Sequence, residues 1–182
     1  MNMKQLSCTI ALLSLFLLGA CNRIRETVIT EQIIDNVDNV IYSNPKQVRD
    51  TVIFIENSEN INTLAELVKP MRGRKIFIGI WATWCGPCIA QFRYSKALRK
   101  ILNDNDIQML YVSVDRESFH QQWKNMIQLH NLTGKHIRAN EYLARYLQRG
   151  VPRYMLIDEE GNIIQKYAQW PSQIVSAGYI DF

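Results

Sequence analysis

Two cysteines separated by two residues form a pair that can do redox chemistry. They are Cys85 and Cys88, in the segment Trp84-Cys85-Gly86-Pro87-Cys88. Two thiols at this spacing can close a small disulfide, and the thiolate form of a cysteine is the nucleophile in disulfide exchange. Apolar residues run up to the pair and recur at helical spacing after it, so the pair is predicted at a turn between a buried strand and a helix.

The elements predicted around this turn favour an activated first cysteine. Ile76–Trp81 is rich in β-branched and aromatic residues and is predicted as a strand, and a single helix is expected over Ile89–Leu102. Cys85 would then lie at a helix N-terminus, where unpaired backbone N–H groups and the helix dipole favour a thiolate. Pro87 fits the first helical turn, because it lacks only a donor that has no partner there.

A zinc site and an inert structural pair are the alternatives for the two cysteines. Zinc sites with this cysteine spacing usually add a second cysteine pair or two histidines three to five residues apart. His130 and His136 have five residues between them, but they lie far downstream of the cysteine pair, and no further cysteine lies beside His120, His130 or His136. A helix entrance also exposes and activates sulfur, which argues against an inert pair. The redox interpretation is therefore preferred, and no metal or cofactor is expected.

Length, composition and charge are those of an ordinary folded protein. The chain has 182 residues, of which 47% are hydrophobic and 21% charged. These values suit one globular domain with appendages. The formal net charge is only +4, and no basic stretch alternates with aromatic residues, so nucleic-acid binding is not expected.

The N-terminus is predicted to be a targeting segment. A short positive start precedes an apolar run, Leu6–Leu18, which has the length of a signal peptide and is too short for a membrane span. The run ends in Leu18-Gly19-Ala20-Cys21, which resembles a bacterial lipobox. That resemblance implies cleavage before Cys21 and lipidation of its sulfur. An ordinary signal peptide with a chance cysteine is the alternative.

Cysteine usage fits an exported, lipid-anchored protein. Cys8 would leave with the signal peptide and Cys21 would carry the lipid, so only the pair remains. An exported domain with a single pair uses it for chemistry rather than as a staple. The domain is expected in the cell envelope, facing the periplasm and held by its acyl chains. The predicted boundaries are a signal peptide at 1–20, a lipidated tether or extension at 21–49 and a folded domain at 50–182.

Hydrophobic periodicity predicts the remaining elements of the folded domain. Strands are expected at 50–55 and 107–114, the second one parallel to Ile76–Trp81 through a right-handed crossover. Asn62 or Thr63 would cap one helix, Asp115 or Ser118 would cap another, and Tyr146 would point inward from a third. Helices are expected at 62–71, from about 117, at 141–147 and from 171, and a hairpin at 155–158 and 163–167.

This order of elements resembles the thioredoxin fold, and in particular the TlpA/ResA-type thiol–disulfide oxidoreductases, which are membrane-tethered. The resemblance covers residues 50–170 and implies an α/β fold with a central mixed sheet flanked by helices. The matching blocks are 77–88, 111–115, 150–152 and 155–164.

The resemblance also implies a second element of the site. Pro152 would open the terminal hairpin in the cis form and lie against the cysteine pair. The backbone of Val151 could then pair with an extended substrate segment. Trp84 would supply an exposed rim on which a partner docks.

One residue departs from the pattern of thioredoxins proper. They carry a buried aspartate where this chain has Gly79, and that acid assists proton transfer to and from the second thiol. Glycine cannot do this. Asp115 and Glu141 are the candidates for a replacement, although exposure to solvent is the simpler interpretation of Glu141.

The predicted activity is a two-step thiol–disulfide exchange. The Cys85 thiolate attacks a substrate disulfide, and Cys88 then resolves the mixed disulfide. The Gly-Pro dipeptide between them resembles reducing thioredoxins, whose potential is about −270 mV, so a protein disulfide reductase is expected. The resemblance implies a membrane thiol transporter as electron donor and disulfide-containing exported proteins, including apocytochromes c, as acceptors.

Two further functions are open alternatives. A thiol peroxidase can be built on the same fold, but peroxiredoxins carry a threonine three residues before the cysteine, where this chain has Ala82. The other alternative is a non-enzymatic lipoprotein in which the cysteine pair binds metal or stabilises a loop.

Overall fold

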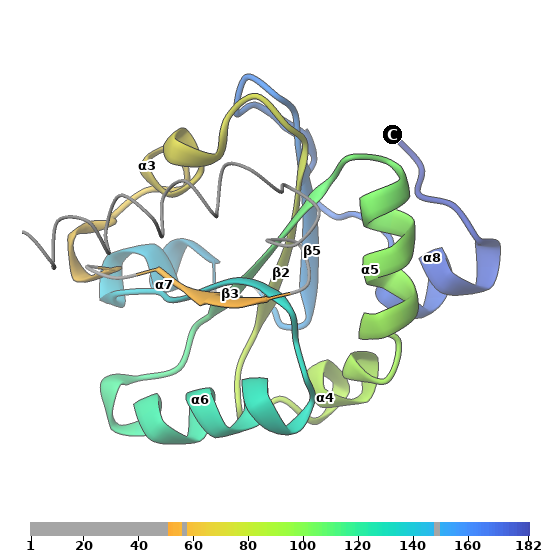
Figure 1. Ribbon diagram of the computed structural model, residues 1–182. Coiled ribbons are helices and arrows are strands. Elements are labelled where there is room, and N and C mark those ends of the chain that lie inside the picture. The colour runs from red at the N-terminus through yellow and green to blue at the C-terminus, as the bar shows by residue number, and fades with distance from the viewer. Residues whose placement is uncertain (1–50, 56–57, 148–149) are drawn as a thin grey trace, which may run out of the picture. The chain divides into compact units, whose positions relative to one another are not determined.

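The computed structural model describes residues 51–55, 58–147 and 150–182 (Figure 1). These residues belong to one compact unit, Val48–Phe182. The predicted signal peptide, the lipidation of Cys21 and the tether at 21–49 lie outside the described residues. Within the described ranges, no helix has both the length and the apolar character needed to cross a membrane.

A six-stranded mixed sheet forms the centre of this unit, in the order β1-β4-β3-β2-β5-β6. The first four strands in that order are parallel, and β5 and β6 are antiparallel to their neighbours. The predicted parallel pairing of the strand before the cysteines with the strand after them is confirmed. The strands are β1 (Val52–Phe54), β2 (Ile76–Trp81), β3 (Gln108–Ser113), β4 (Gly134–Arg138), β5 (Arg153–Ile157) and β6 (Ile163–Gln165).

Helices cover both faces of the sheet. In Figure 1, α5 and α8 lie on one face and α3 and α7 on the other. All six residues of β2 are buried, because this strand lies inside the sheet and between both layers of helices. The helices are α3 (Leu64–Val68), α4 (Gly86–Phe92), α5 (Ser95–Asp104), α6 (His120–Leu129), α7 (Glu141–Leu147) and α8 (Pro171–Ala177), and the 3-10 turns are η1 (Ser58–Asn60), η2 (Lys69–Met71) and η3 (Glu117–Phe119).

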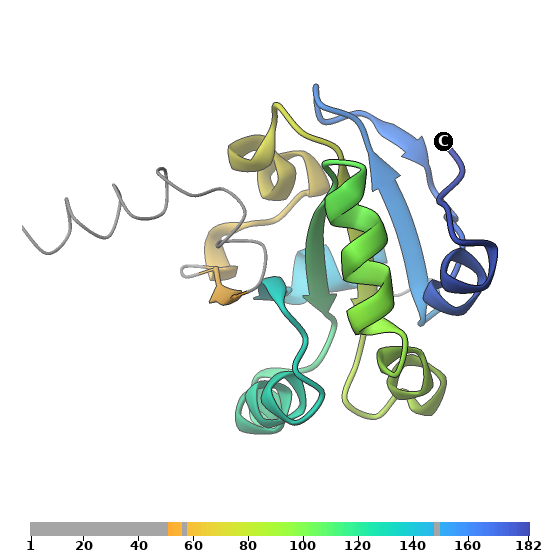
Figure 2. The same ribbon diagram turned by 45° about the vertical axis from the view of Figure 1, so that its right-hand side comes forward.

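The single helix predicted over Ile89–Leu102 is wrong, because the segment forms two helices, α4 and α5. Figure 2 shows α5 packed in front of the sheet, with α4 as a separate helix at its end. The two helices pack on different partners. Phe92 of α4 contacts the ring of Trp81 edge-on, with centroids 5.1 Å apart, whereas Leu98 of α5 belongs to the apolar group around Phe77. Apolar spacing continues through the break, so periodicity alone does not reveal it.

Strand β4 was not predicted from the sequence. Three of its five residues, Lys135, His136 and Arg138, are polar, which hides the strand pattern. The strand is nevertheless hydrogen-bonded on both sides, to β1 and to β3, and His136 and Ile137 are fully buried. Pairing with two neighbours satisfies the backbone, and this tertiary effect outweighs the weak local preference.

Helix ends and one inward residue also need correction. The helix expected from Glu117 begins as η3 and continues as α6, with Arg116 and Phe119 at the N-cap positions instead of Asp115 or Ser118. Tyr146 is half exposed rather than inward.

Other helix and hairpin predictions are confirmed. Thr63 caps α3 in a capping box with Glu66, and α7 has the predicted bounds. The predicted helix at 62–71 forms as α3 followed by η2, and the terminal hairpin is present as β5 and β6.

Candidate functional site

Cys85 and Cys88 form a disulfide at the start of α4, with Cα atoms 5.2 Å apart. Cys85 is the N-cap residue of α4, and its sulfur accepts the backbone N–H of Cys88 at 3.2 Å. Cys85 is 4% exposed and Cys88 is fully buried. Because only the first cysteine has any contact with solvent, it is the one that a substrate can reach first.

The residues next to the cysteines form the surface around the disulfide. Trp84 is 61% exposed. Gly86 and Pro87 are also exposed, and Pro87 lies in the first turn of α4 as predicted. A large apolar side chain kept in water beside a reactive group is typical of a docking surface.

The Val151–Pro152 peptide lies at the same edge of the sheet as the cysteines, and it is cis, as predicted. Arg153, the first residue of β5, pairs with Ile80 of β2, so Pro152 is placed beside the end of β2 that leads into the cysteine turn. The side chain of Val151 packs against the apolar cluster that contains both cysteines. The fold therefore brings together two segments that are far apart in the sequence.

The two candidates for a replacement acid differ sharply in their surroundings. Glu141 is exposed and forms an ion pair with Arg145 one helical turn away. Asp115 is 2% exposed and follows β3. Its carboxylate accepts the backbone N–H of Thr83 at 2.9 Å and the Thr83 hydroxyl at 2.8 Å. Asp115 is thus hydrogen-bonded to the loop that leads to the cysteines. Glu141 is exposed to solvent, as its simpler interpretation from the sequence had it.

Aromatic rings occupy the space beside Gly79. Its partners across the two neighbouring strands are Tyr111 and Tyr154. A Cβ atom at this position would lie 3.1 Å from the Met109 Cε atom and 3.3 Å from the Tyr154 Cε1 atom. The absence of a side chain at Gly79 therefore leaves room for the rings of Tyr111 and Tyr154 on the neighbouring strands.

Three titratable side chains of this region, Tyr111, Tyr154 and His136, are held in their neutral forms by burial. Burial raises the pKa of the Tyr111 and Tyr154 phenols, and for Tyr111 the charge of Arg99 opposes only part of that rise. Burial lowers the pKa of His136 to about 4, although its ring donates a hydrogen bond to the Leu132 carbonyl at 2.7 Å. His136 stacks on Tyr111 with centroids 4.8 Å apart. Of these three side chains, which are the ones the structure describes with shifted pKa values beside Gly79, none favours its charged form at neutral pH.

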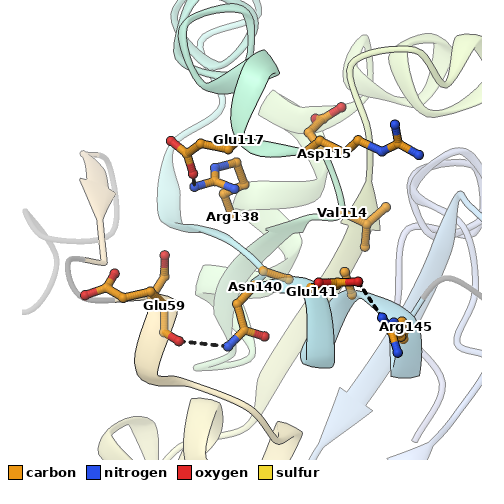
Figure 3. Close-up of a pocket in the computed structure, with 12 residues that line it drawn as sticks. Glu59, Val114, Asp115, Glu117, Arg138, Asn140, Glu141 and Arg145 are labelled. Atoms are coloured by element: carbon orange, nitrogen blue, oxygen red, sulfur yellow. Dashed lines mark hydrogen bonds and ion pairs between the residues drawn. The ribbon is translucent and has the colours of Figure 1, made fainter.

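A cavity of about 620 Å³ opens where β3 and β4 end (Figure 3). Periodicity did not predict it, because its walls come from three separate segments, 58–59, 114–117 and 138–145. Figure 3 shows the Asp115 carboxylate pointing away from the middle of the cavity, and the Asn140 amide donating to the Glu59 carbonyl. The lining residues are Ser58, Glu59, Val114, Asp115, Arg116, Glu117, Arg138, Ala139, Asn140, Glu141, Ala144 and Arg145. Among the described residues, no group of three His, Cys, Asp or Glu side chains is arranged to hold a metal ion.

The Redoxin family model matches residues 43–174, which include the cysteine turn, the cis peptide and most of the sheet. The chain belongs to the Redoxin family. The Redoxin match therefore covers both halves of the candidate site, the Cys85–Cys88 turn and the Val151–Pro152 peptide.

Curated relatives of this Redoxin chain are thiol–disulfide oxidoreductases. It is 21% identical over 115 residues to the thiol-disulfide oxidoreductase ResA of Bacillus cereus, and the match covers 62% of this chain and 65% of that protein. It is 27% identical over 96 residues to ResA of Geobacillus kaustophilus, with 52% and 54% covered. The matches thus span less than two thirds of each relative. The TlpA/ResA resemblance is confirmed, and these relatives support an oxidoreductase role.

Solved structures confirm the thioredoxin-like fold. A proposed thiol-disulfide oxidoreductase from Bacteroides vulgatus is 31% identical, with a TM-score of 0.51, and the match covers 60% of this chain and 73% of that one. The thioredoxin domain of another Bacteroides vulgatus thiol-disulfide oxidoreductase has a TM-score of 0.52 at 19% identity, with 61% and 81% covered.

Proposed function

We propose that the protein is a thiol–disulfide oxidoreductase that reduces disulfides of exported proteins. The observation that carries this proposal is the Cys85–Cys88 disulfide at the start of α4, at the sheet edge that also holds the Val151–Pro152 peptide. The similarity to ResA relatives over part of their length supports the same activity.

In the proposed reaction the reduced pair gives two electrons to a substrate disulfide. The Cys85 thiolate attacks one substrate sulfur, the substrate S–S bond breaks, and the released sulfur takes a proton. Cys88 loses its proton and attacks the Cys85 sulfur, which releases the second substrate thiol and leaves the Cys85–Cys88 disulfide. Cys88 is the resolving residue because it is fully buried and lies next to the mixed disulfide rather than to solvent.

The surrounding residues position the substrate. Trp84 provides apolar contact area beside the disulfide, and Gly86 and Pro87 leave the approach to the sulfurs open. The backbone of Val151 pairs with an extended segment of the substrate, as in β-strand addition. Pro152 has no N–H of its own and therefore does not compete for that segment.

The sequence supports a location in the cell envelope. Lipidation of Cys21 would hold the domain at a membrane, outside the cytoplasm and facing the periplasm, because two acyl chains anchor a protein stably. A reductase in that compartment needs electrons from across the membrane, and a membrane thiol transporter is the proposed donor. Disulfide-containing exported proteins, among them apocytochromes c, are the proposed acceptors.

The catalytic proposal is tested by insulin-disulfide reduction with the full chain. Cys85→Ser is expected to abolish reduction, since Cys88, the other thiol of the described residues, is fully buried and cannot make the first attack. Cys88→Ser is expected to stop turnover and to accumulate mixed disulfides through Cys85, whose partners can be identified by mass spectrometry. Cys8→Ser serves as the matched cysteine control and should keep wild-type activity. Reduction that survives Cys85→Ser would contradict the proposal.

Two further measurements test the competing functions and the anchor. Peroxide consumption by the wild-type protein that is faster than insulin reduction would favour a thiol peroxidase. For the anchor, Cys21→Ala is expected to move the protein from the membrane fraction to the soluble fraction of an expressing cell. Unchanged membrane association in Cys21→Ala would rule out the lipid.

A further inference from the structure

Asp115 joins the end of β3 to the loop that carries the cysteines. Its side chain is 2% exposed, and the carboxylate accepts hydrogen bonds from the N–H and the hydroxyl of Thr83, at 2.9 and 2.8 Å. The hydroxyl of Ser113 donates a third hydrogen bond at 2.7 Å. Every partner is a donor, which is the pattern of an ionised carboxylate that only accepts hydrogen bonds.

Thr83 lies inside the turn that ends at Cys85. The N–H of Cys85 donates to the Ala82 carbonyl at 3.1 Å, which closes a four-residue turn. The first and last Cα atoms of such a turn lie within about 7 Å of each other. A carboxylate fixed on the second residue of this turn is therefore a near neighbour of the first cysteine.

The charge of Asp115 is compensated by neutral hydrogen-bond donors. Helix α4, which carries the cysteine pair, has no charged residue. On the cavity side, two of the three arginines are paired with glutamates (Figure 3). Within the part of the chain that the structure describes, no ion pair involves Asp115. The charged residues on that side are Glu59, Arg116, Glu117, Arg138, Glu141 and Arg145.

We propose that Asp115 is a positioning residue that also sets the acidity of the Cys85 thiol, an inference that rests on the proposed function. Its hydrogen bonds hold Thr83 and so fix Cys85 at the start of α4. Its negative charge opposes the Cys85 thiolate and therefore raises the pKa of that thiol. A less stable thiolate makes the reduced pair less stable, so the dithiol–disulfide couple becomes more reducing.

Two substitutions separate the charge from the hydrogen bonds. Asp115→Asn removes the charge and keeps the size of the side chain, so the pKa of Cys85 should fall by ~0.5–1 unit. The disulfide should become about three- to tenfold easier to reduce, which is a rise of about 15–30 mV in its potential. Thr83→Val removes one donor and leaves the charge less compensated, so the pKa of Cys85 should not fall. Thr83→Ser keeps the hydroxyl and should match the wild type.

The measurements use the full chain and need no protein substrate. The rate of Cys85 alkylation against pH gives the thiol pKa, and equilibration in glutathione redox buffers gives the potential. A fall in the pKa in both Asp115→Asn and Thr83→Val would mean that a loosened turn explains the effect, and the inference would be wrong. An unchanged pKa in Asp115→Asn would overturn it as well.

Folding of the variants and the proposed function are controlled separately. If circular dichroism shows that Asp115→Asn does not fold, Thr83→Val still decides, because a fall in its thiol pKa contradicts the charge effect and an unchanged or raised pKa supports it. A wild-type protein without a reversible Cys85–Cys88 couple would refute the proposed function. A normal wild-type couple that does not respond to Asp115→Asn would refute this inference alone.

Discussion

Gly79 lies in β2, and the cysteine turn follows directly after that strand. The two regions nevertheless surround their titratable side chains with different groups. At the turn, the buried carboxylate of Asp115 is surrounded by donors from Thr83 and Ser113. Around Gly79, the neighbouring side chains are aromatic rings and a methionine, and the titratable ones are kept neutral by burial. The buried carboxylate of Asp115 is thus met by several donors, as a buried carboxylate requires.

This contrast is consistent with the position of the buried carboxylate, which follows β3 at Asp115 and not the middle of β2. Thioredoxins proper, which the sequence resembles, carry their aspartate at the position of Gly79. Here a side chain at that position would press against Met109 and Tyr154, and the buried carboxylate that the structure describes, Asp115, follows the next strand instead. The Asp115 carboxylate is therefore hydrogen-bonded to the loop before the cysteines, and it does not lie beside the middle of β2.

Placing an acid at the sheet centre should have the largest effect on stability. Gly79→Asp would bury a carboxylate in a tight space against Met109 and Tyr154, so the free energy of unfolding should fall by about 3–5 kcal/mol. Gly79→Ala is the matched control for size and should cost about 1–3 kcal/mol. Urea unfolding followed by circular dichroism measures both. Equal losses in the two variants would mean that space alone, and not charge, excludes the acid.

Acidification should lower the free energy of unfolding by a somewhat smaller amount, through His136. The pKa of His136 is lowered to about 4 in the folded protein, below the unfolded value of 6.5, so the unfolded state binds a proton first as the pH falls. Stability from this group is present above pH 6.5 and is lost as the pH falls toward 4, by about 3 kcal/mol between pH 7 and 4.

Urea unfolding at several pH values checks the histidine effect. His136→Gln retains an N–H donor for the Leu132 carbonyl and does not titrate. The difference in free energy of unfolding between wild type and His136→Gln should therefore change by about 3 kcal/mol between pH 7 and 4. Parallel pH curves for the two proteins would show that His136 is not the group responsible.

Truncating the exposed side of the turn should affect substrate reduction and leave stability almost unchanged. Trp84 is 61% exposed, so Trp84→Ala should change the free energy of unfolding by less than about 1 kcal/mol. Its contact area would be lost to a protein substrate, and the KM for insulin should rise several-fold. Reduction of a small aromatic disulfide serves as the control and should change little. An unchanged KM for insulin would remove Trp84 from the docking surface.

The smallest effect is expected at the other candidate acid. Glu141 and Arg145 form an exposed pair within one helix, and such pairs contribute little in water. Glu141→Gln should leave the urea midpoint and the redox potential unchanged within error. A shift of the potential in this variant comparable to that of Asp115→Asn would end the distinction drawn between the two acids.

The sequence alone predicted the parts of this protein that depend on neighbouring residues. The Cys85–Cys88 spacing, the strand before it, the cap at Thr63 and the hairpin around Gly161 follow from local periodicity and turn chemistry. The cis peptide before Pro152 followed from resemblance to a family rather than from local rules.

Only the tertiary structure decided the features that rest on contacts between distant segments. Strand β4 forms because two neighbours satisfy its backbone, despite three polar residues. The break between α4 and α5 forms because the two helices pack on different partners. The sequence named Asp115 and Glu141 as candidate acids alike, and only the hydrogen bond from Thr83 to Asp115, across thirty-two residues of sequence, separates the two. Local patterns do not contain such pairings, because only the folded chain sets the distance and burial that give them their energy.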